Sequence, residues 1–420
     1  MRFVACCALL ALASTGSLSG QSPGPGAAAP GIPADLIEFS TPDDNPPSPE
    51  KIALGEKLFN DKRLSADGST ACATCHDPEK GFTDRLQTSR GIRDQVGQRN
   101  APTVLNAMFF ETQFLDGRAP SLEEQSKLPI LNPIEMGMKE PDEVVAKLAE
   151  IPEYRDEFQR VFGRPVNYDD MARAIASFER TITSGEAPID RFLRGDENAL
   201  TEAQKRGWSL FNGKARCMSC HAFNPSYPLF SDGRFHNIGV AANKQNFEDL
   251  ALRAIAAVNS NDLEEIDRMA IETEFSELGR FLVTKKRLDI GAFKTNHLRE
   301  IAMTAPYMHD GSLATLWDVM DHYNKGGIPN PFLDGGITRL GLTEEEIDDL
   351  VALMEAFTSD RFAQAAADEM ARQKRVAEKQ RPERETEVAM GREQHRGDAI
   401  PDHGEKDPAQ IGGRPLENQD

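Results

Sequence analysis

Histidine is scarce in this sequence and unevenly placed. The 420 residues contain eight histidines, but none lies between His76 and His221. A metal held by His76 therefore has no second imidazole available in residues 77–220. A bis-histidine centre built entirely inside this part of the chain is excluded.

Positive charge is also in short supply. Lysine and arginine number 48 against 68 aspartates and glutamates, which gives a net charge of −20 and a pI near 4.9. Nucleic acid is excluded as a partner, because phosphate binding needs a basic face. A partner protein with a basic patch fits this charge better.

Long apolar runs are missing beyond the start of the chain, where a membrane helix would need roughly 20 continuous apolar residues. The first 20 residues, MRFVACCALLALASTGSLSG, have one early arginine, a short apolar run and then small residues. This pattern is typical of a secretory signal peptide. We therefore expect export to the periplasm, with a retained N-terminal anchor as the alternative.

The segments that flank the middle of the chain are poor in core-forming residues. Residues 21–47 are rich in proline and glycine, which predicts a linker. Residues 361–420 are charged and contain few aromatic or β-branched residues. They predict a short solvated helix followed by a disordered tail.

Between these segments, runs of alternating β-type residues are scarce, so we expect a mainly α protein with long loops. Four helix starts can be recognised from capping residues. These are Ser48 before Pro49, Asn167 before an apolar-periodic run, and the capping boxes Thr201 with Gln204 and Thr343 with Glu346.

Cysteine is limited to six residues, and Cys6 and Cys7 fall inside the signal segment, where no lipid-attachment pattern surrounds them. The other four form two C-x-x-C pairs, each followed directly by histidine. A G-x-x-L-F-N stretch precedes both pairs, so we expect duplicated modules over residues 48–198 and 199–360. The motif residues are Cys72, Cys75 and His76, then Cys217, Cys220 and His221.

C-x-x-C-H is the attachment signature of c-type haem, in which two thiols bind the haem covalently and the histidine ligates the iron. Two disulfides are an alternative for an exported protein, but they leave the adjacent histidines unexplained. A zinc site is another alternative, but the first module has no second histidine to complete it. Two covalent haems are therefore predicted, the first with an open distal side that can bind a small ligand.

Two longer stretches are similar to a known family. They are GQRNAPTVLNAMFFETQFLDGRAPSLEEQSKLPILNPIEMG and GAFKTNHLREIAMTAPYMHDGSLATLWDVMDHYNKGG. Over about residues 48–358 the chain resembles the bacterial dihaem cytochrome c peroxidases and their MauG-type relatives. The resemblance implies two cytochrome c-like haem domains and a cytochrome-c peroxidase-type oxidoreductase.

The resemblance also implies site residues. Glu135 would be the distal acid–base of the first haem, since one carboxyl can take a proton from peroxide and return it, and Gln125 would be its hydrogen-bonding neighbour. Asn100, Thr304 and Pro306 would hold a calcium ion between the domains through oxygen ligands and water. The alternatives are a surface acid at Glu135 and ordinary turns at the calcium positions.

At the second haem, the ordinary peroxidases have a methionine as sixth ligand, but the corresponding position here is Tyr323, as in MauG-type enzymes. Met320 lies three residues earlier and would share its helix face, and Met308 and His322 are further alternatives. A thioether raises the iron potential, whereas a phenolate favours high oxidation states.

The chain departs from the family at two positions. Leu115 occupies the place of an inter-haem tryptophan, and Ala215 occupies the place of a tryptophan that relays oxidation in MauG. Of the two tryptophans present, we expect Trp208 to pack in the core; the other is Trp317. Residues 241–287 are expected to form an acidic helical insertion, either for partner docking or as a solvated structural element.

These features predict a dihaem enzyme that reduces hydrogen peroxide at the first haem. Electrons would arrive through the second haem from a small redox protein, a cytochrome c or a cupredoxin. A MauG-like maturation enzyme that oxidises a partner protein is an alternative. A non-catalytic dihaem electron carrier is an alternative of another class.

Overall fold

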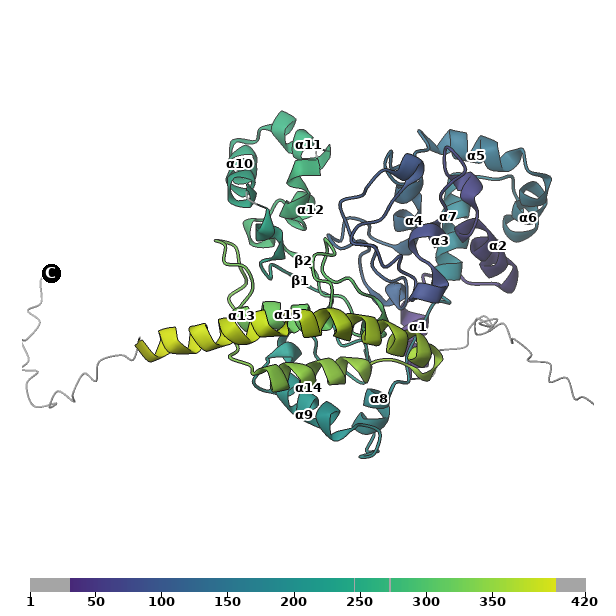
Figure 1. Ribbon diagram of the computed structural model, residues 1–420. Helices are drawn as coiled ribbons and strands as arrows, with labels where there is room; N and C mark the ends of the chain where they lie inside the picture. Colours follow the sequence, from purple (N-terminus) through teal and green to yellow (C-terminus); the bar gives the residue numbers. More distant parts are fainter. Residues whose placement is uncertain (1–30, 245, 272, 398–420) are drawn as a thin grey trace, which may run out of the picture.

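The computed structural model describes residues 31–244, 246–271 and 273–397, and it is mainly α-helical, as the sequence predicts (Figure 1). Two short antiparallel strands pair Phe235 with Lys294 and His236 with Phe293. None of the described helices combines the length and the apolarity that a membrane crossing requires. The helices and strands are α1 (Ala34–Phe39), α2 (Pro49–Phe59), α3 (Cys72–Cys75), α4 (Leu122–Leu131), α5 (Pro141–Ala149), α6 (Pro152–Phe162), α7 (Tyr168–Glu179), α8 (Pro188–Leu193), α9 (Glu202–Asn212), β1 (Phe235–His236), α10 (Phe247–Ser260), α11 (Leu263–Ile271), α12 (Phe281–Thr284), β2 (Phe293–Lys294), α13 (Leu316–Lys325), α14 (Glu344–Glu355) and α15 (Ala363–Gly397).

All four expected helix starts are confirmed. In each case the side chain of the residue before the helix accepts a hydrogen bond from a backbone N–H of the first turn, which satisfies a donor that the helix itself leaves unpaired. The capping residues are Ser48 for α2, Asn167 for α7, Thr201 for α9 and Thr343 for α14.

Two helix pairs repeat the same close crossing. Gly55 of α2 lies so near α7 that a Cβ atom added to it would be 1.9 Å from the carbonyl oxygen of Ala174. Gly207 of α9 lies equally near α14, with the added Cβ 2.2 Å from the carbonyl oxygen of Asp349. Both glycines open a G-x-x-L-F-N stretch. The sequence repeat therefore encodes one tight helix crossing beside each C-x-x-C-H motif.

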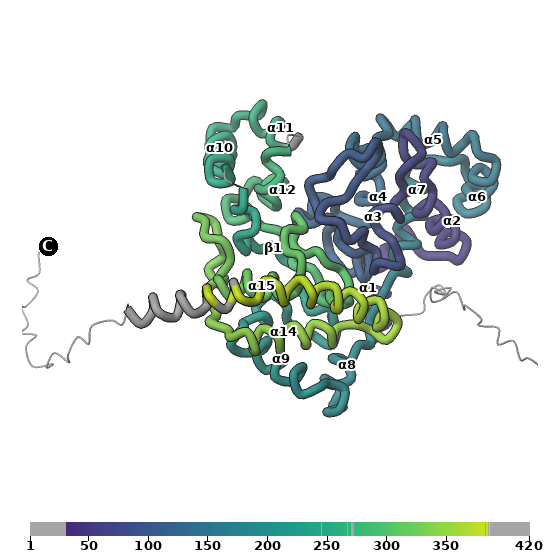
Figure 2. The backbone as a smooth tube through the Cα atoms, viewed as in Figure 1, coloured from purple at the N-terminus to yellow at the C-terminus, as the bar shows by residue number. Residues whose placement is uncertain are grey.

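Residues 240–284 form a helical lobe, called here the α10–α12 lobe, which confirms that this segment is helical. The lobe is a separate projection in the backbone view (Figure 2). It has its own hydrophobic cluster, in which Phe247, Leu278 and Phe281 are buried, and Leu115 and Phe293 from other segments join that cluster. The lobe is thus attached to the body through packing around Leu115 and Phe293.

The two flanking segments are more ordered than the sequence predicts. Residues 31–47 of the expected linker contain α1 and a buried Asn45, whose amide donates to Glu123. The tail prediction is wrong up to residue 397, because α15 continues for 35 residues. The buried residues Ala366, Met370 and Ala377 recur on one helix face and pack against the body.

Several sequence predictions concern residues outside the described part of the chain. They are the signal peptide with Cys6 and Cys7, residues 21–30 of the linker, and residues 398–420 of the tail.

Candidate active site

The first C-x-x-C-H motif forms a single helical turn, α3, and His76 follows as its C-cap. Nδ1 of His76 donates a hydrogen bond of 3.1 Å to the carbonyl oxygen of Phe82. Because a carbonyl can only accept, the proton lies on Nδ1 and Nε2 keeps its lone pair. Burial lowers the pKa of His76, which favours the neutral form that binds a metal.

The second motif repeats this arrangement. Nδ1 of His221 donates a hydrogen bond of 2.8 Å to the carbonyl oxygen of Phe230, and burial lowers the pKa of His221. Phe82 and Phe230 have φ angles of 58° and 55°, a region that residues other than glycine seldom adopt. In both motifs, therefore, a carbonyl oxygen of a residue with positive φ orients the imidazole and leaves Nε2 free for iron.

The four motif cysteines carry free thiols in the structure, so the disulfide alternative is wrong for Cys72, Cys75, Cys217 and Cys220. Free thiols next to an oriented histidine are the donor set that covalent haem attachment requires.

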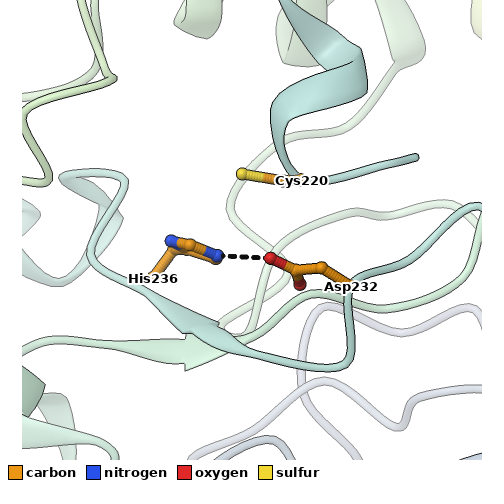
Figure 3. Close-up of side chains that lie close together, drawn as sticks. All are labelled: Cys220, Asp232 and His236. Atoms are coloured by element: carbon orange, nitrogen blue, oxygen red, sulfur yellow. Dashed lines mark hydrogen bonds and ion pairs between the residues drawn. The ribbon is translucent and has the colours of Figure 1, made fainter.

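The zinc alternative finds no support in the described residues. The clustered donors that could hold a metal ion there are Cys220, Asp232 and His236 (Figure 3), and none of these belongs to the first motif. Both ring nitrogens of His236 are already bonded, Nε2 to Asp232 at 2.9 Å and Nδ1 to Asp334 at 2.5 Å. Asp232 and then Asp334 raise the pKa of His236 to about 12, so both of its nitrogens are engaged by carboxylates.

A cavity adjoins the second motif and is the natural place for its haem. Its wall includes the motif residues Cys217, Cys220 and His221 and apolar side chains from both halves of the chain. Three of the four candidate sixth ligands also line it: Tyr323, Met320 and Met308. Burial raises the pKa of Tyr323, and the charges of Cys220 and Cys217 raise it further. The phenol of Tyr323 therefore lies beside the second motif.

His322, the fourth candidate, is directed elsewhere. It is buried, is absent from the cavity wall, and its Nε2 bonds to the carbonyl oxygen of Ile238 at 2.9 Å. Adjacent residues on a helix point in directions about 100° apart, so Tyr323 and His322 cannot both face the cavity. His322 as an iron ligand is therefore a wrong alternative.

Glu135 lies close to the first motif, just after α4. Burial is the main cause of the raised pKa of Cys72 and of Cys75, and the charge of Glu135 raises both further. The carboxyl of Glu135 therefore lies near both thiols. Burial also raises the pKa of Glu135 itself, while Arg118 acts in the opposite direction. A carboxyl with a raised pKa can hold and release a proton at moderate pH.

The hydrogen-bonding neighbour of Glu135 differs from the expected one. Nδ2 of Asn132, the C-cap of α4, donates a hydrogen bond of 2.9 Å to Oε1 of Glu135. The side chain of Gln125, about two turns before Asn132 in α4, bonds to no described residue. Asn132 and Arg118 were missed in the sequence, although asparagine before Pro133 in LNPIEMG is a recognisable helix end.

The three expected calcium ligands, Asn100, Thr304 and Pro306, all line the cavity of the second motif. Nδ2 of Asn100 donates to the carbonyl oxygen of Leu86 at 2.9 Å. This bond leaves Oδ1 of Asn100 free as an acceptor. The arrangement fits a hard cation held by neutral oxygens.

Comparison with known proteins agrees with this geometry. The family profile for di-haem cytochrome c peroxidase matches residues 49–198. Cytochrome-c peroxidase IdrP1 of Pseudomonas sp. (strain SCT) is 38% identical over 328 residues, which cover 77% of this chain and 85% of the relative. The chain belongs to the dihaem cytochrome c peroxidase and MauG family. It is a peroxidase-type oxidoreductase that uses two haems.

Other relatives of this dihaem peroxidase point the same way. Methylamine utilization protein MauG of Methylorubrum extorquens is 40% identical over 321 residues, covering 76% of this chain and 81% of the relative. A solved structure of a MauG-like protein associated with microbial copper homeostasis has a TM-score of 0.63 and 31% identity, covering 79% of this chain and 95% of that chain. The mainly α, cytochrome c-like fold is confirmed.

The structure shows what surrounds the positions at which this dihaem peroxidase differs from its family, and what surrounds its two tryptophans. Leu115 and Ala215 both line the cavity of the second motif. Trp208 is partly buried and packs against the core, where it stacks on Phe211 at 5.7 Å and meets Phe230 edge-on at 6.5 Å. Trp317 donates from Nε1 to Asp348 at 2.7 Å.

Proposed function

We propose that this dihaem peroxidase is exported to the periplasm and reduces hydrogen peroxide to two waters at the haem site of residues 48–198. Two electrons and two protons complete the reaction. The electrons arrive through the haem site of residues 199–360 from a small redox protein, a cytochrome c or a cupredoxin. The observation that carries this proposal is the Glu135 carboxyl beside a motif that has no second histidine.

Haem would supply a redox-active iron at each motif. In the proposal the thiols attach each haem covalently, the motif histidines bind the irons through Nε2, and Tyr323 is the sixth ligand of the second iron. The holding residues are Cys72, Cys75 and His76 for the first haem, and Cys217, Cys220, His221 and Tyr323 for the second.

Glu135 moves the proton that peroxide cleavage requires. Its carboxylate takes a proton from the peroxide oxygen that lies nearer the first haem. It returns this proton to the oxygen that lies farther from the haem, and that oxygen leaves as water. Asn132 occupies Oε1 of Glu135, so Oε2 is the oxygen free for this transfer.

A calcium ion would hold the loops of the two halves together through Asn100, Thr304 and Pro306. Removal of calcium by a chelator should then loosen these loops and lower activity, since the bound ion stabilises only the folded arrangement.

Peroxide turnover by the purified holoenzyme tests the proposal, starting from the fully oxidised state with a panel of cytochrome c and cupredoxin donors. Rapid donor oxidation supports it, and an enzyme that never consumes peroxide would be an electron carrier instead. MauG-like maturation is the second candidate, favoured by the tyrosine in the second cavity. It would consume peroxide while oxidising a partner protein rather than a redox donor.

A further inference from the structure

Four side chains from four segments form one compact unit beside the second cavity. Glu277 of the α10–α12 lobe is its centre and is only 4% exposed. Its Oε2 lies 2.7 Å from Nε2 of His309, and its Oε1 accepts from Nη1 of Arg99 at 3.0 Å. One buried carboxylate thus connects the first half of the chain, through Arg99, with the second half, through His309.

Aromatic stacking completes the unit. The rings of Phe293 and His309 are nearly parallel, at an angle of 7° with centroids 3.7 Å apart. The guanidinium of Arg99 lies 4.9 Å from the centroid of the Phe293 ring. Stacked rings and a cation over a ring are both favourable contacts, so the four side chains restrain one another.

The unit occupies the space next to Leu115. Phe293 and His309 line the second cavity together with Leu115. The carbonyl oxygen of Leu115 accepts from the backbone N–H of Lys294 at 2.8 Å, directly after Phe293. Phe293 and His309 therefore contribute aromatic rings to the cavity wall beside Leu115, while position 115 itself offers only an aliphatic side chain.

A short bonded path runs from this unit toward the first motif. The backbone N–H of Asn100 donates to the carbonyl oxygen of His309 at 3.0 Å. Three residues later, the hydroxyl of Thr103 donates to the carbonyl oxygen of Gly81 at 2.6 Å. Gly81 precedes Phe82, whose carbonyl oxygen binds Nδ1 of His76.

We propose that Arg99, Glu277, Phe293 and His309 form the electron bridge between the two haem sites, with Glu277 as its positioning residue. This inference rests on the proposed function. For each electron that crosses, the second haem site is oxidised by one electron and the first is reduced by one. The bridge gains and loses none, and the redox protein donor replaces the electron. These contacts join the cavity of the second motif, which Phe293 and His309 line, to the loop that orients His76, where an open gap would slow transfer.

Glu277→Gln tests the positioning role in the holoenzyme. The matched control is Glu274→Gln, an exposed acid on the same turn. The measurement is the rate at which one electron, placed by photoreduction, redistributes between the haems without peroxide. We expect Glu277→Gln to lower this rate about tenfold. This is the lower end of the loss that follows when a hydrogen bond supporting a metal centre is removed. Glu274→Gln should leave the rate unchanged.

A second pair of variants tests the aromatic part. Phe293→Leu should slow redistribution, whereas Phe281→Leu, a buried phenylalanine of the same cluster outside the stack, should not. Phe293→Leu combined with Glu277→Gln should be no slower than the slower single variant, because both remove the same unit. Hydrogen exchange of residues 273–278 and 305–311 should become faster in Glu277→Gln but not in Glu274→Gln.

The bridge is refuted if Glu277→Gln redistributes electrons at the parent rate while its hydrogen exchange shows the contact to be lost. Equal slowing by Phe293→Leu and Phe281→Leu would also refute it. A parent that does not reduce peroxide, yet redistributes electrons more slowly after Glu277→Gln, would overturn the proposed function and leave the bridge standing.

Discussion

Asn132 donates a hydrogen bond of 2.9 Å from Nδ2 to Oε1 of Glu135. Its other amide atom, Oδ1, accepts from the backbone N–H of Ile134 at 2.9 Å, so the orientation of the amide is defined by both bonds. Because Asn132 ends α4, the helix itself positions the carboxyl beside the first motif. Glu135 is thus left with one oxygen engaged and one available for a proton.

Glu135→Gln should slow peroxide cleavage by about 10²–10⁴-fold, because the amide keeps the shape of the side chain but cannot carry the proton. Both haems should still be incorporated, with unchanged absorption spectra. Stopped-flow absorption after mixing with peroxide measures the rate. Glu124→Gln, an exposed position on α4, is the matched control, and unchanged kinetics in Glu135→Gln would remove Glu135 from the mechanism.

The peroxide reaction should depend on pH through Glu135. Burial raises the pKa of this carboxyl above its usual value of 4.5, and only the ionised form can take the first proton. The rate should therefore be highest above this raised pKa and fall as pH decreases through it. Stopped-flow rates over a pH series measure the midpoint. A midpoint at or below 4.5, or an identical profile in Glu135→Gln, would contradict the assignment.

Tyr323→Met should change how the enzyme is activated. If the phenol ligates the second iron, the oxidised parent should show one high-spin and one low-spin haem by electron paramagnetic resonance. The oxidised parent should also react with peroxide directly. The methionine variant should need one haem reduced first, because a thioether raises the iron potential.

Met320→Leu is the control for this comparison, since Met320 lines the same cavity but should not be the ligand. A parent that stays inert until partly reduced would show that the tyrosine mechanism is wrong. Loss of the low-spin signal in Met320→Leu alone would identify the thioether as the ligand instead.

Gly207→Ala should destabilise the half that carries the second motif. The new Cβ would lie 2.2 Å from the carbonyl oxygen of Asp349, and overpacking typically costs about 1–3 kcal/mol. The better helix propensity of alanine returns about 1 kcal/mol at most. Thermal unfolding followed by circular dichroism measures the change. Gly335→Ala, where the added Cβ meets no atom within 4 Å, should unfold like the parent.

Much of the site can be predicted from local sequence. The C-x-x-C-H motifs, the helix caps and the G-x-x-L-F-N repeat each depend on residues a few positions apart. Their structures therefore follow from short-range chemistry. The long resemblance to the dihaem peroxidases adds Glu135 and Tyr323, and the structure places both beside the motifs to which they were assigned.

The remaining features were decided only by the tertiary structure. Glu277 is separated by 178 positions from Arg99 and by 32 from His309, and no local pattern indicates that one buried carboxylate bonds to both. The sequence of α15 has few of the residues that usually form cores, yet its buried apolar residues pack against the body of the protein. Which side chains meet depends on how whole segments pack, because a buried charge persists only where distant partners satisfy it.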